Sequence, residues 1–375
     1  MFPEGYSVGK LGSQAPNTET GDFDVVRNST ATRVNKDGLI EVMGANVPRL
    51  DYSDGGCPKL LTEQSGTNLV TYSEDFSQWL GTPTFVSLND SISPSGEYNA
   101  CRLTMGANQF FYCPNPAPSG EVVTSSIYIN GVQGETITLE AGGFYITHTL
   151  SGGWERIIST GTSVGTSISL NTYGGVTARN FLVWGGQMEL GSTPTSYIPT
   201  NGGIGTRQAD QVTNAGDSST FNSQSGVLFA DFKENSVQTD NSGQSIFSIT
   251  GVGGVNIGTT TNSRIRAYIY SSDDFQLDFK IPYNTLLQNK MALIYQNGNS
   301  SLYINGLLIQ TESSVDLSQL VLNELNLDNS AGSFRVRGKT KSIQHYDYLS
   351  DEEMESLTGY DSYSAMTEQF NFNVL

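Results

Sequence analysis

The chain has 375 residues and a formal net charge of −18, from 19 basic and 37 acidic residues. Residues 1–65, 66–216 and 217–375 are each net negative. We therefore expect no nucleic-acid partner, because binding to phosphates needs clustered Lys and Arg. No 18-residue apolar run and no signal peptide is evident, so we expect no membrane insertion. The 41 Gly, 18 Tyr and 17 Phe favour strands and tight turns over helices.

Residues 1–65 carry scattered prolines and only short apolar groups. Such a segment rarely folds alone, so we expect an extended arm that needs a partner surface.

Residues 66–190 have the alternation of a β-domain. Val123, Ser125, Ile127 and Ile129 share one strand face, and paired glycines at intervals of about ten residues mark turns. This spacing predicts a β-sandwich or jelly roll. Residues 191–225 are rich in Gly, Ser, Thr and Asn and are expected to be a linker, in which Tyr197 and Ile198 make anchoring contacts.

Residues 226–358 predict a second β-sandwich. Phe275, Leu277, Phe279 and Ile281 are expected to face one side of a strand. Two hairpins are expected at Asn297-Gly298 and Asn305-Gly306, because Asn-Gly accepts positive φ. Ser350 and Glu353 form a capping-box pattern for a short helix that ends near Gly359. The tail, 359–375, is expected to pair as an edge strand or to pack on another subunit.

The three cysteines, Cys57, Cys101 and Cys113, do not have the spacing of a disulfide framework or of a zinc site. Free thiols are favoured, and a Cys101–Cys113 disulfide is the alternative. Free thiols fit assembly in a reducing cytoplasm.

Three stretches between residues 20 and 215 resemble structural proteins of tailed bacteriophages, of the head-fibre, spike or tail-fibre type. The first stretch comprises Ala31–Val42, Pro48–Tyr52, Cys57–Leu61 and Thr67–Leu69; the second is Tyr72–Trp79; the third is Trp184–Thr200, closing on Thr206–Asp210. The resemblance implies an N-terminal attachment segment followed by a carbohydrate-binding-module-like jelly roll. Ser301–Gly306 and Tyr348–Leu357 resemble the hairpin and the terminal helix of a concanavalin A-like (laminin G-type) lectin domain.

Residues for catalysis are sparse. The two histidines, His148 and His345, lie in different predicted domains, and no G-x-S-x-G motif occurs. The carboxylate pairs Glu74-Asp75 and Asp273-Asp274 are interpreted as a local structural pair and a solvated turn. We therefore expect no enzyme activity.

Exposed aromatic rings can stack on sugars, and the candidate glycan-binding residues are Trp79, Tyr112, Tyr145, Tyr268 and Tyr270. Packing in a core or between subunits is the competing interpretation of each ring. No cofactor is expected, apart from calcium as an option at Asp273 and Asp274, because an acidic loop on a β-sandwich can hold Ca²⁺.

These observations predict an all-β chain with two β-sandwich domains in tandem after the N-terminal arm. The function that they indicate is a structural component of a virion that displays lectin-like modules for attachment to host-surface glycans. The chain is expected to associate with itself as a homotrimer, or else as a dimer, and with other virion proteins through residues 1–65. The alternative is a secreted or cell-surface glycan-binding adhesin, or the binding subunit of a glycan-degrading enzyme.

Overall fold

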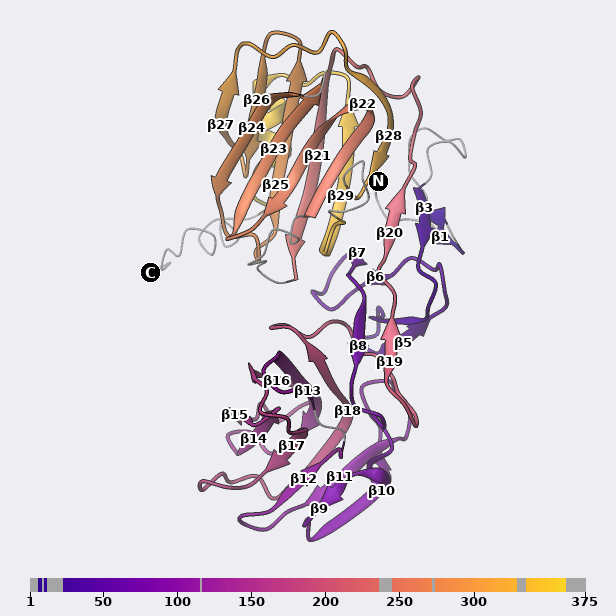
Figure 1. Cartoon of the computed structure of the whole chain (residues 1–375), viewed down its shortest axis with the longest axis vertical. Coiled ribbons are helices and arrows are strands. Elements are labelled where there is room, and N and C mark those ends of the chain that lie inside the picture. Colours follow the sequence, from indigo (N-terminus) through magenta and orange to yellow (C-terminus); the bar gives the residue numbers. More distant parts are fainter. Residues whose placement is uncertain are drawn as a thin grey trace. The chain divides into compact units, whose positions relative to one another are not determined.

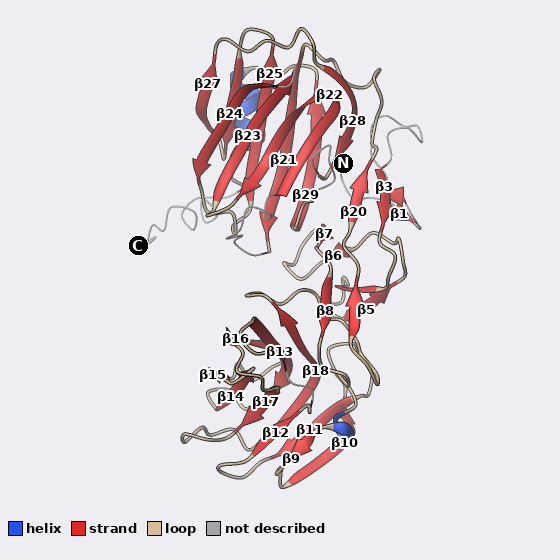
Figure 2. Cartoon of the chain, viewed as in Figure 1, coloured by secondary structure: helices blue, strands red, loops and turns tan. Residues whose placement is uncertain are grey.

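The computed structural model describes residues 6–8, 10–11, 23–114, 117–235, 245–271, 274–328 and 335–361. Strands make up 52% of the chain and helix 3%, which confirms the all-β class. The chain divides into two compact units (Figures 1 and 2). Unit 1 comprises Met1–Asn28, Ala45–Gln64 and Ala209–Leu375, and unit 2 comprises Ser29–Gly44 and Ser65–Gln208.

Unit 2 is a sandwich of two five-stranded antiparallel sheets. The β18 sheet has the order β10 (Phe85–Ser91), β11 (Ala100–Thr104), β18 (Asn180–Leu190), β13 (Val122–Asn130), β16 (Glu155–Thr162). The β14 sheet has the order β15 (Phe144–Thr149), β14 (Thr136–Ala141), β17 (Ile168–Asn171), β12 (Phe110–Tyr112), β9 (Leu80–Gly81). Alternate apolar residues of the central strands fill the core between the sheets. Val123, Ile127 and Ile129 of β13 belong to this core, and the residues between them on the other face, Thr124 and Ser126, are buried as well.

Smaller elements of unit 2 are the hairpin of β4 (Ala31–Val34) and β5 (Ile40–Met43), the pair β8 (Gly66–Asn68) and β19 (Gly205–Arg207), and the 3₁₀ helix η2 (Phe76–Gln78). The three stretches of the resemblance meet here. The Trp184 ring lies 4.5 Å from that of Tyr197, and the Tyr197 hydroxyl lies 2.7 Å from the Ser73 hydroxyl. The buried Asn68 amide donates to the carbonyls of Gly186 and Ile198. These motif residues hold unit 2 together.

Unit 1 is a second sandwich. Its larger sheet has the order β27 (Leu307–Glu312), β26 (Ser300–Ile304), β25 (Asn289–Gln296), β21 (Ser225–Glu234), β29 (Gly338–Tyr346), β7 (Lys59–Thr62), β6 (Leu50–Asp51). Its smaller sheet has the order β24 (Asp274–Pro282), β23 (Arg264–Ser271), β22 (Ser245–Thr260), β28 (Val321–Asn326). A third sheet has the order β1 (Tyr6–Ser7), β2 (Lys10–Leu11), β3 (Phe23–Val26), β20 (Gln211–Thr213). The core of unit 1 is a large apolar cluster drawn from all three sheets.

The local signals in unit 1 lead to the expected elements. Asn305 and Gly306 both have positive φ and turn β26 into β27, and Gly298 turns β25 into β26. Helix α1 (Asp351–Thr358) begins at a complete capping box of Ser350 and Glu353. Met354 of this helix packs on Val227, Phe229, Ala292 and Tyr303 of the seven-stranded sheet; Figure 2 shows the helix in blue behind the strands.

One strand-face prediction is wrong. Leu277 and Phe279 are buried as expected, whereas Phe275 is half exposed. The register of β23 and β24 shifts between Ile269 and Tyr270, where Tyr270 pairs with Phe275. This bulge moves Phe275 to the opposite face of the sheet, because one extra residue reverses the alternation.

The expected arm of residues 1–65 differs from the structure. Leu60 of β7 pairs with Thr340 of β29, so this part of the arm completes the edge of the seven-stranded sheet. Buried ion pairs join Arg49 to Glu63 and Asp210, and Arg27 also pairs with Asp210. These residues are internal to unit 1, whereas Ser29–Gly44 of the same segment belong to unit 2. The partner strand lies about 280 residues away in sequence, so no local pattern could reveal the pairing.

The expected linker also contributes to both units. Tyr197 and Ile198 are buried in unit 2, which confirms them as anchoring residues. The segment adds β19 to unit 2 and β20 to unit 1. The edge-strand prediction for the tail rests on Phe370–Leu375, which lie outside the described residues.

Candidate functional site

The outer surface of the β14 sheet combines aromatic rings with buried polar side chains. Ile137, Leu139, Leu170 and Phe111 belong to the core of unit 2. Because side chains alternate along a strand, residues of the other parity point away from the core. We call this surface the tyrosine face, and it comprises Phe110, Tyr112, Thr138, Glu140, Tyr145, Ser169 and Asn171.

Strand register aligns these side chains in rows across the sheet. Tyr145 of β15 lies opposite Glu140 of β14, which lies opposite Ser169 of β17, which lies opposite Tyr112 of β12. A tyrosine therefore stands at each end of the row. In the neighbouring row, Thr138 lies opposite Asn171, which lies opposite Phe110.

Glu140 is the centre of a hydroxyl network. Its Oε1 accepts from the Thr166 hydroxyl at 2.7 Å, and its Oε2 accepts from the Ser169 hydroxyl at 2.5 Å. Tyr145 lies opposite Glu140 on the neighbouring strand, and the pKa of the Tyr145 hydroxyl is raised, first by burial and then by the charge of Glu140. Glu140 is only 7% exposed, whereas Tyr145 is 56% exposed. The exposed ring thus stands beside a buried carboxylate.

Asn171 is 2% exposed, and its Nδ2 is a buried donor without an acceptor among the described residues. An unpaired buried donor costs about 1–3 kcal/mol. The Phe110 and Tyr112 rings stand beside it, 5.9 Å apart and only partly buried. A ligand acceptor at this position would satisfy the amide.

The structure brings two of the candidate residues together and separates the others. Tyr112 and Tyr145 share the tyrosine face. The interpretation of Trp79 as a sugar-stacking ring disagrees with its 4% exposure. Its ring packs on Phe76 and Phe111, and its Nε1 donates to the carbonyl of Tyr72 at 2.9 Å. Trp79 is part of the core of unit 2.

Tyr268 and Tyr270 lie on the smaller sheet of unit 1, on the face turned away from Ile269. Tyr268 is 9% exposed, and the Arg266 guanidinium covers its ring at 4.3 Å, so that ring face is already occupied. Tyr270 is more exposed and meets Phe275 at 5.6 Å with the rings nearly perpendicular. Tyr268 lies opposite Asn256 and Asp278, and Asp278 is ion-paired to Arg266 and Lys280, so the charged groups beside these rings are already paired with one another.

The candidate calcium residues are placed only in part. Asp273 lies outside the described residues. Asp274 is exposed at the start of β24, and its Oδ1 accepts from the Phe275 N–H at 2.8 Å. Across the described ranges, no three His, Cys, Asp or Glu side chains are grouped as a metal site. No described helix is long and apolar enough to cross a membrane.

The histidines have structural partners. His148 Nε2 lies 3.2 Å from the Ser159 hydroxyl, and burial lowers the pKa of His148. His345 Nε2 lies 2.9 Å from the Tyr295 hydroxyl, and burial lowers the pKa of His345 to about 4. All three cysteines are free.

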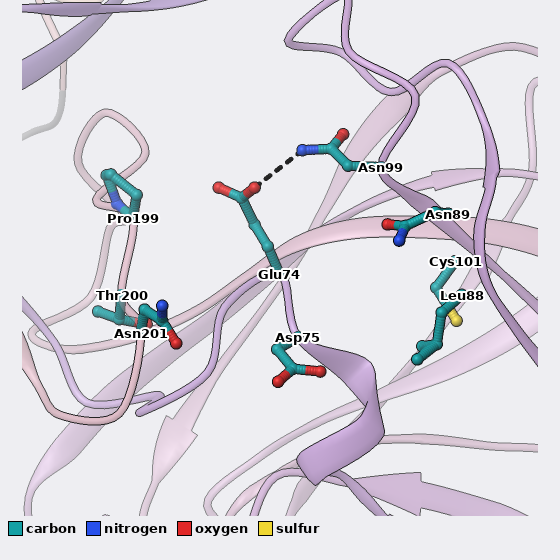
Figure 3. A pocket seen from close by; sticks show the side chains of 9 residues that line it. All are labelled: Glu74, Asp75, Leu88, Asn89, Asn99, Cys101, Pro199, Thr200 and Asn201. Atoms are coloured by element: carbon teal, nitrogen blue, oxygen red, sulfur yellow. Dashed lines mark hydrogen bonds between the residues drawn. The ribbon is translucent and has the colours of Figure 1, made fainter.

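A separate cavity of about 460 Å³ in unit 2 is lined partly by residues of the second and third motif stretches (Figure 3). Glu74 Oε2 accepts from Asn99 Nδ2 at 3.0 Å, and Glu74 Oε1 accepts from the Tyr197 hydroxyl. Asp75 caps η2 by accepting from the Ser77 N–H. Both carboxylates thus support local structure. The nine lining side chains include no aromatic ring for stacking on a sugar.

Sequence patterns alone missed Glu140, Ser169 and Asn171 as site residues. The alternation of Thr138 and Glu140 with Ile137 and Leu139 in the sequence is the signal that could have indicated an outward-facing row. The pairing of β14 with β17 and of β17 with β12, which assembles the site, joins segments 30 to 60 residues apart.

No family model and no curated protein matches the chain. Among solved structures, the carbohydrate-binding module CBM40 of the Ruminococcus gnavus IT-sialidase, bound to α2,3-sialyllactose, is 20% identical over 36% of this chain and 83% of its own, with a TM-score of 0.31. Mouse laminin α1 domains LG4-5 are 8% identical over 73% and 90%, with a TM-score of 0.29. A putative carbohydrate-binding protein from Bacteroides ovatus is 12% identical over 79% and 85%, with a TM-score of 0.28. At these scores the likenesses carry no argument about a ligand.

Proposed function

We propose that the chain binds glycans through the tyrosine face of unit 2. The observation that carries the proposal is the row of Tyr145, Glu140, Ser169 and Tyr112, in which two rings flank buried hydrogen-bonding groups. Sugars present apolar C–H faces to aromatic rings and hydroxyl groups to amides and carboxylates. The row supplies both kinds of partner on one rigid sheet.

The dimensions of the row favour an oligosaccharide. Three inter-strand steps separate β15 from β12, and each step is about 4.8 Å, so the tyrosines are about 14 Å apart. One sugar ring is too short to contact both tyrosines. A chain of sugars laid across the strands would stack on each and place hydroxyl groups over Glu140 and Asn171.

The test is binding of the full chain to an array of oligosaccharides, followed by calorimetric titration of the strongest ligand. Tyr112→Ala and Tyr145→Ala are each expected to weaken binding at least about tenfold, or ~1.4 kcal/mol, since each removes one stacking surface. Asn171→Ala is expected to weaken binding through the loss of a donor.

Tyr98→Ala is the matched control. Tyr98 is 64% exposed in unit 2 and lies between β10 and β11 of the other sheet, so its removal is expected to leave binding unchanged. An array without any bound glycan, or equal losses for Tyr98→Ala and Tyr145→Ala, would overturn the proposal.

We propose in addition that the chain is displayed on a bacteriophage particle as a self-associated structural protein, a homotrimer first and a dimer second. The support is the order of the three motif stretches in the sequence. Mass spectrometry and antibody labelling of purified particles test the location, and sedimentation equilibrium tests the oligomeric state. Absence of the chain from purified particles would favour the alternative, a secreted or cell-surface glycan-binding adhesin.

A further inference from the structure

We infer that the tyrosine face selects uncharged oligosaccharides and rejects sialylated or sulfated ones. The inference rests on the proposed function, because it assigns the ligand class of the same face. It follows from the placement of charge on the β14 sheet.

The strands of this sheet contain no lysine or arginine. Their sequences are LG, FFY, TITLEA, FYITHT and ISLN, and Glu140 is their one acidic residue. The carboxyl group of Glu140 sits at the middle of the row and accepts hydrogen bonds from the hydroxyl groups of Thr166 and Ser169. The face therefore carries one negative group and no compensating cation.

The basic residues between 65 and 208 belong to other parts of unit 2. Arg102 of β11 pairs with Asp90, and Arg156 of β16 lies over the Tyr128 ring and donates to Ser126 and Thr195. Arg179 precedes β18, and Arg207 lies on β19. None of these four arginines lies on a strand of the β14 sheet, and the same holds for Arg33 and Lys36 in the hairpin of β4 and β5.

Burial makes the repulsion effective. Water and salt screen the charge of Glu140 less than that of an exposed carboxylate, because its side chain is almost fully covered. An anionic ligand would lose hydration at this face and gain no ion pair in return. An uncharged sugar would instead donate its hydroxyl hydrogens toward the carboxyl oxygens.

The experiment compares the full chain on matched glycans: uncharged oligosaccharides, and the same oligosaccharides carrying sialic acid or sulfate. The expected result is binding of the uncharged forms and at least about tenfold weaker binding of the anionic forms. Glu140→Gln keeps the shape and removes the charge. This variant is expected to reduce the ratio between the affinities for the uncharged and the anionic forms by about tenfold.

Glu97→Gln is the control with the same change of net charge. Glu97 is exposed between β10 and β11, and its change is expected to leave the ratio of the two affinities as in the wild type. If Glu140 only orients Tyr145, Glu140→Gln will lower binding of both forms equally and keep the ratio, which overturns the inference. Equal or stronger binding of the anionic forms by the wild type overturns it too, while leaving glycan binding intact. If the chain binds neither the uncharged nor the anionic form, both the proposed function and the inference are wrong.

Discussion

Glu234 at the end of β21 is expected to make the stability of unit 1 depend on pH. Its side chain is 2% exposed, and its Oε1 accepts from the Thr259 hydroxyl at 2.5 Å. Burial raises the pKa of Glu234 from 4.5 to about 7, against the opposing effects of the hydrogen bond from Thr259 and of the charge of Arg337. The folded state therefore holds the proton more tightly than the unfolded chain does.

The sign and size follow from this difference. Below a pH of about 4.5 the Glu234 carboxyl is protonated in the folded and in the unfolded chain, so it does not change the free energy of unfolding with pH. As the pH rises to about 7, the unfolded chain loses the proton first, so the free energy of unfolding falls. The rise in pKa corresponds to about 3 kcal/mol, which is an upper value because side chains relax around a new charge. Glu234→Gln is expected to recover most of this stability at about pH 8 and little at about pH 4.

The assay separates the two units by their tryptophans. All three tryptophans, Trp79, Trp154 and Trp184, belong to unit 2, so their fluorescence reports unfolding of unit 2 alone. Circular dichroism reports both units, and the transition without a fluorescence change is that of unit 1. Urea unfolding of the wild type, Glu234→Gln and the control Glu355→Gln, at three pH values, gives the free energies. Parallel pH curves for the wild type and Glu234→Gln would refute a buried ionisation at this site.

Three further predictions concern contacts that stabilise the interior of one unit or the other. Arg49→Met removes the buried ion pairs of Arg49 with Glu63 and Asp210, so it is expected to destabilise unit 1 by about 3–5 kcal/mol, measured by circular dichroism; a change below about 1 kcal/mol contradicts the importance of this cluster. Asn68→Ala removes four buried hydrogen bonds in unit 2 and is expected to cost about 3 kcal/mol by tryptophan fluorescence; an unchanged midpoint argues against that count. Ser350→Ala removes the helix cap and is expected to cost about 1 kcal/mol in unit 1, with Ser356→Ala as the control inside the helix.

Features with a local physical cause could be predicted from the sequence. Asn305-Gly306 turns because both residues accept positive φ, and Ser350 with Glu353 caps the helix because both partners lie within one turn. The inward faces of β13 and β14 followed from simple alternation. The same reasoning predicted the wrong face for Phe275, because a bulge, which depends on the partner strand, interrupts the alternation.

Features that depend on distant pairing could not be predicted. Residues 50–62 show only short apolar groups and prolines, yet they form two strands of the seven-stranded sheet because β29 supplies the partner edge. The candidate site has the same origin. Tyr112 and Tyr145 were found by residue type, whereas Ser169 and Asn171 became site residues only when β17 was placed between β14 and β12.

The motifs that carry the family resemblance and the residues of the proposed site have different tasks. Asn68, Trp79 and Tyr197 lie in the motifs, are buried, and hold unit 2 together. The tyrosine face comes entirely from residues 110–171, between the second and third motifs. A chain that shares the motifs is therefore expected to share the sandwich without sharing the ligand.

This separation can be tested within the chain itself. The double variant Tyr112→Ala and Tyr145→Ala removes two partly exposed rings from one face, while every contact of the motif residues stays in place. Its free energy of unfolding, measured by tryptophan fluorescence, is expected to change by less than about 1 kcal/mol, whereas glycan binding is lost. A large loss of stability would mean that the face belongs to the supporting structure of unit 2. Asn68→Ala is expected to show the opposite behaviour. It lowers the stability of unit 2, and it weakens glycan binding only to the extent that the protein unfolds.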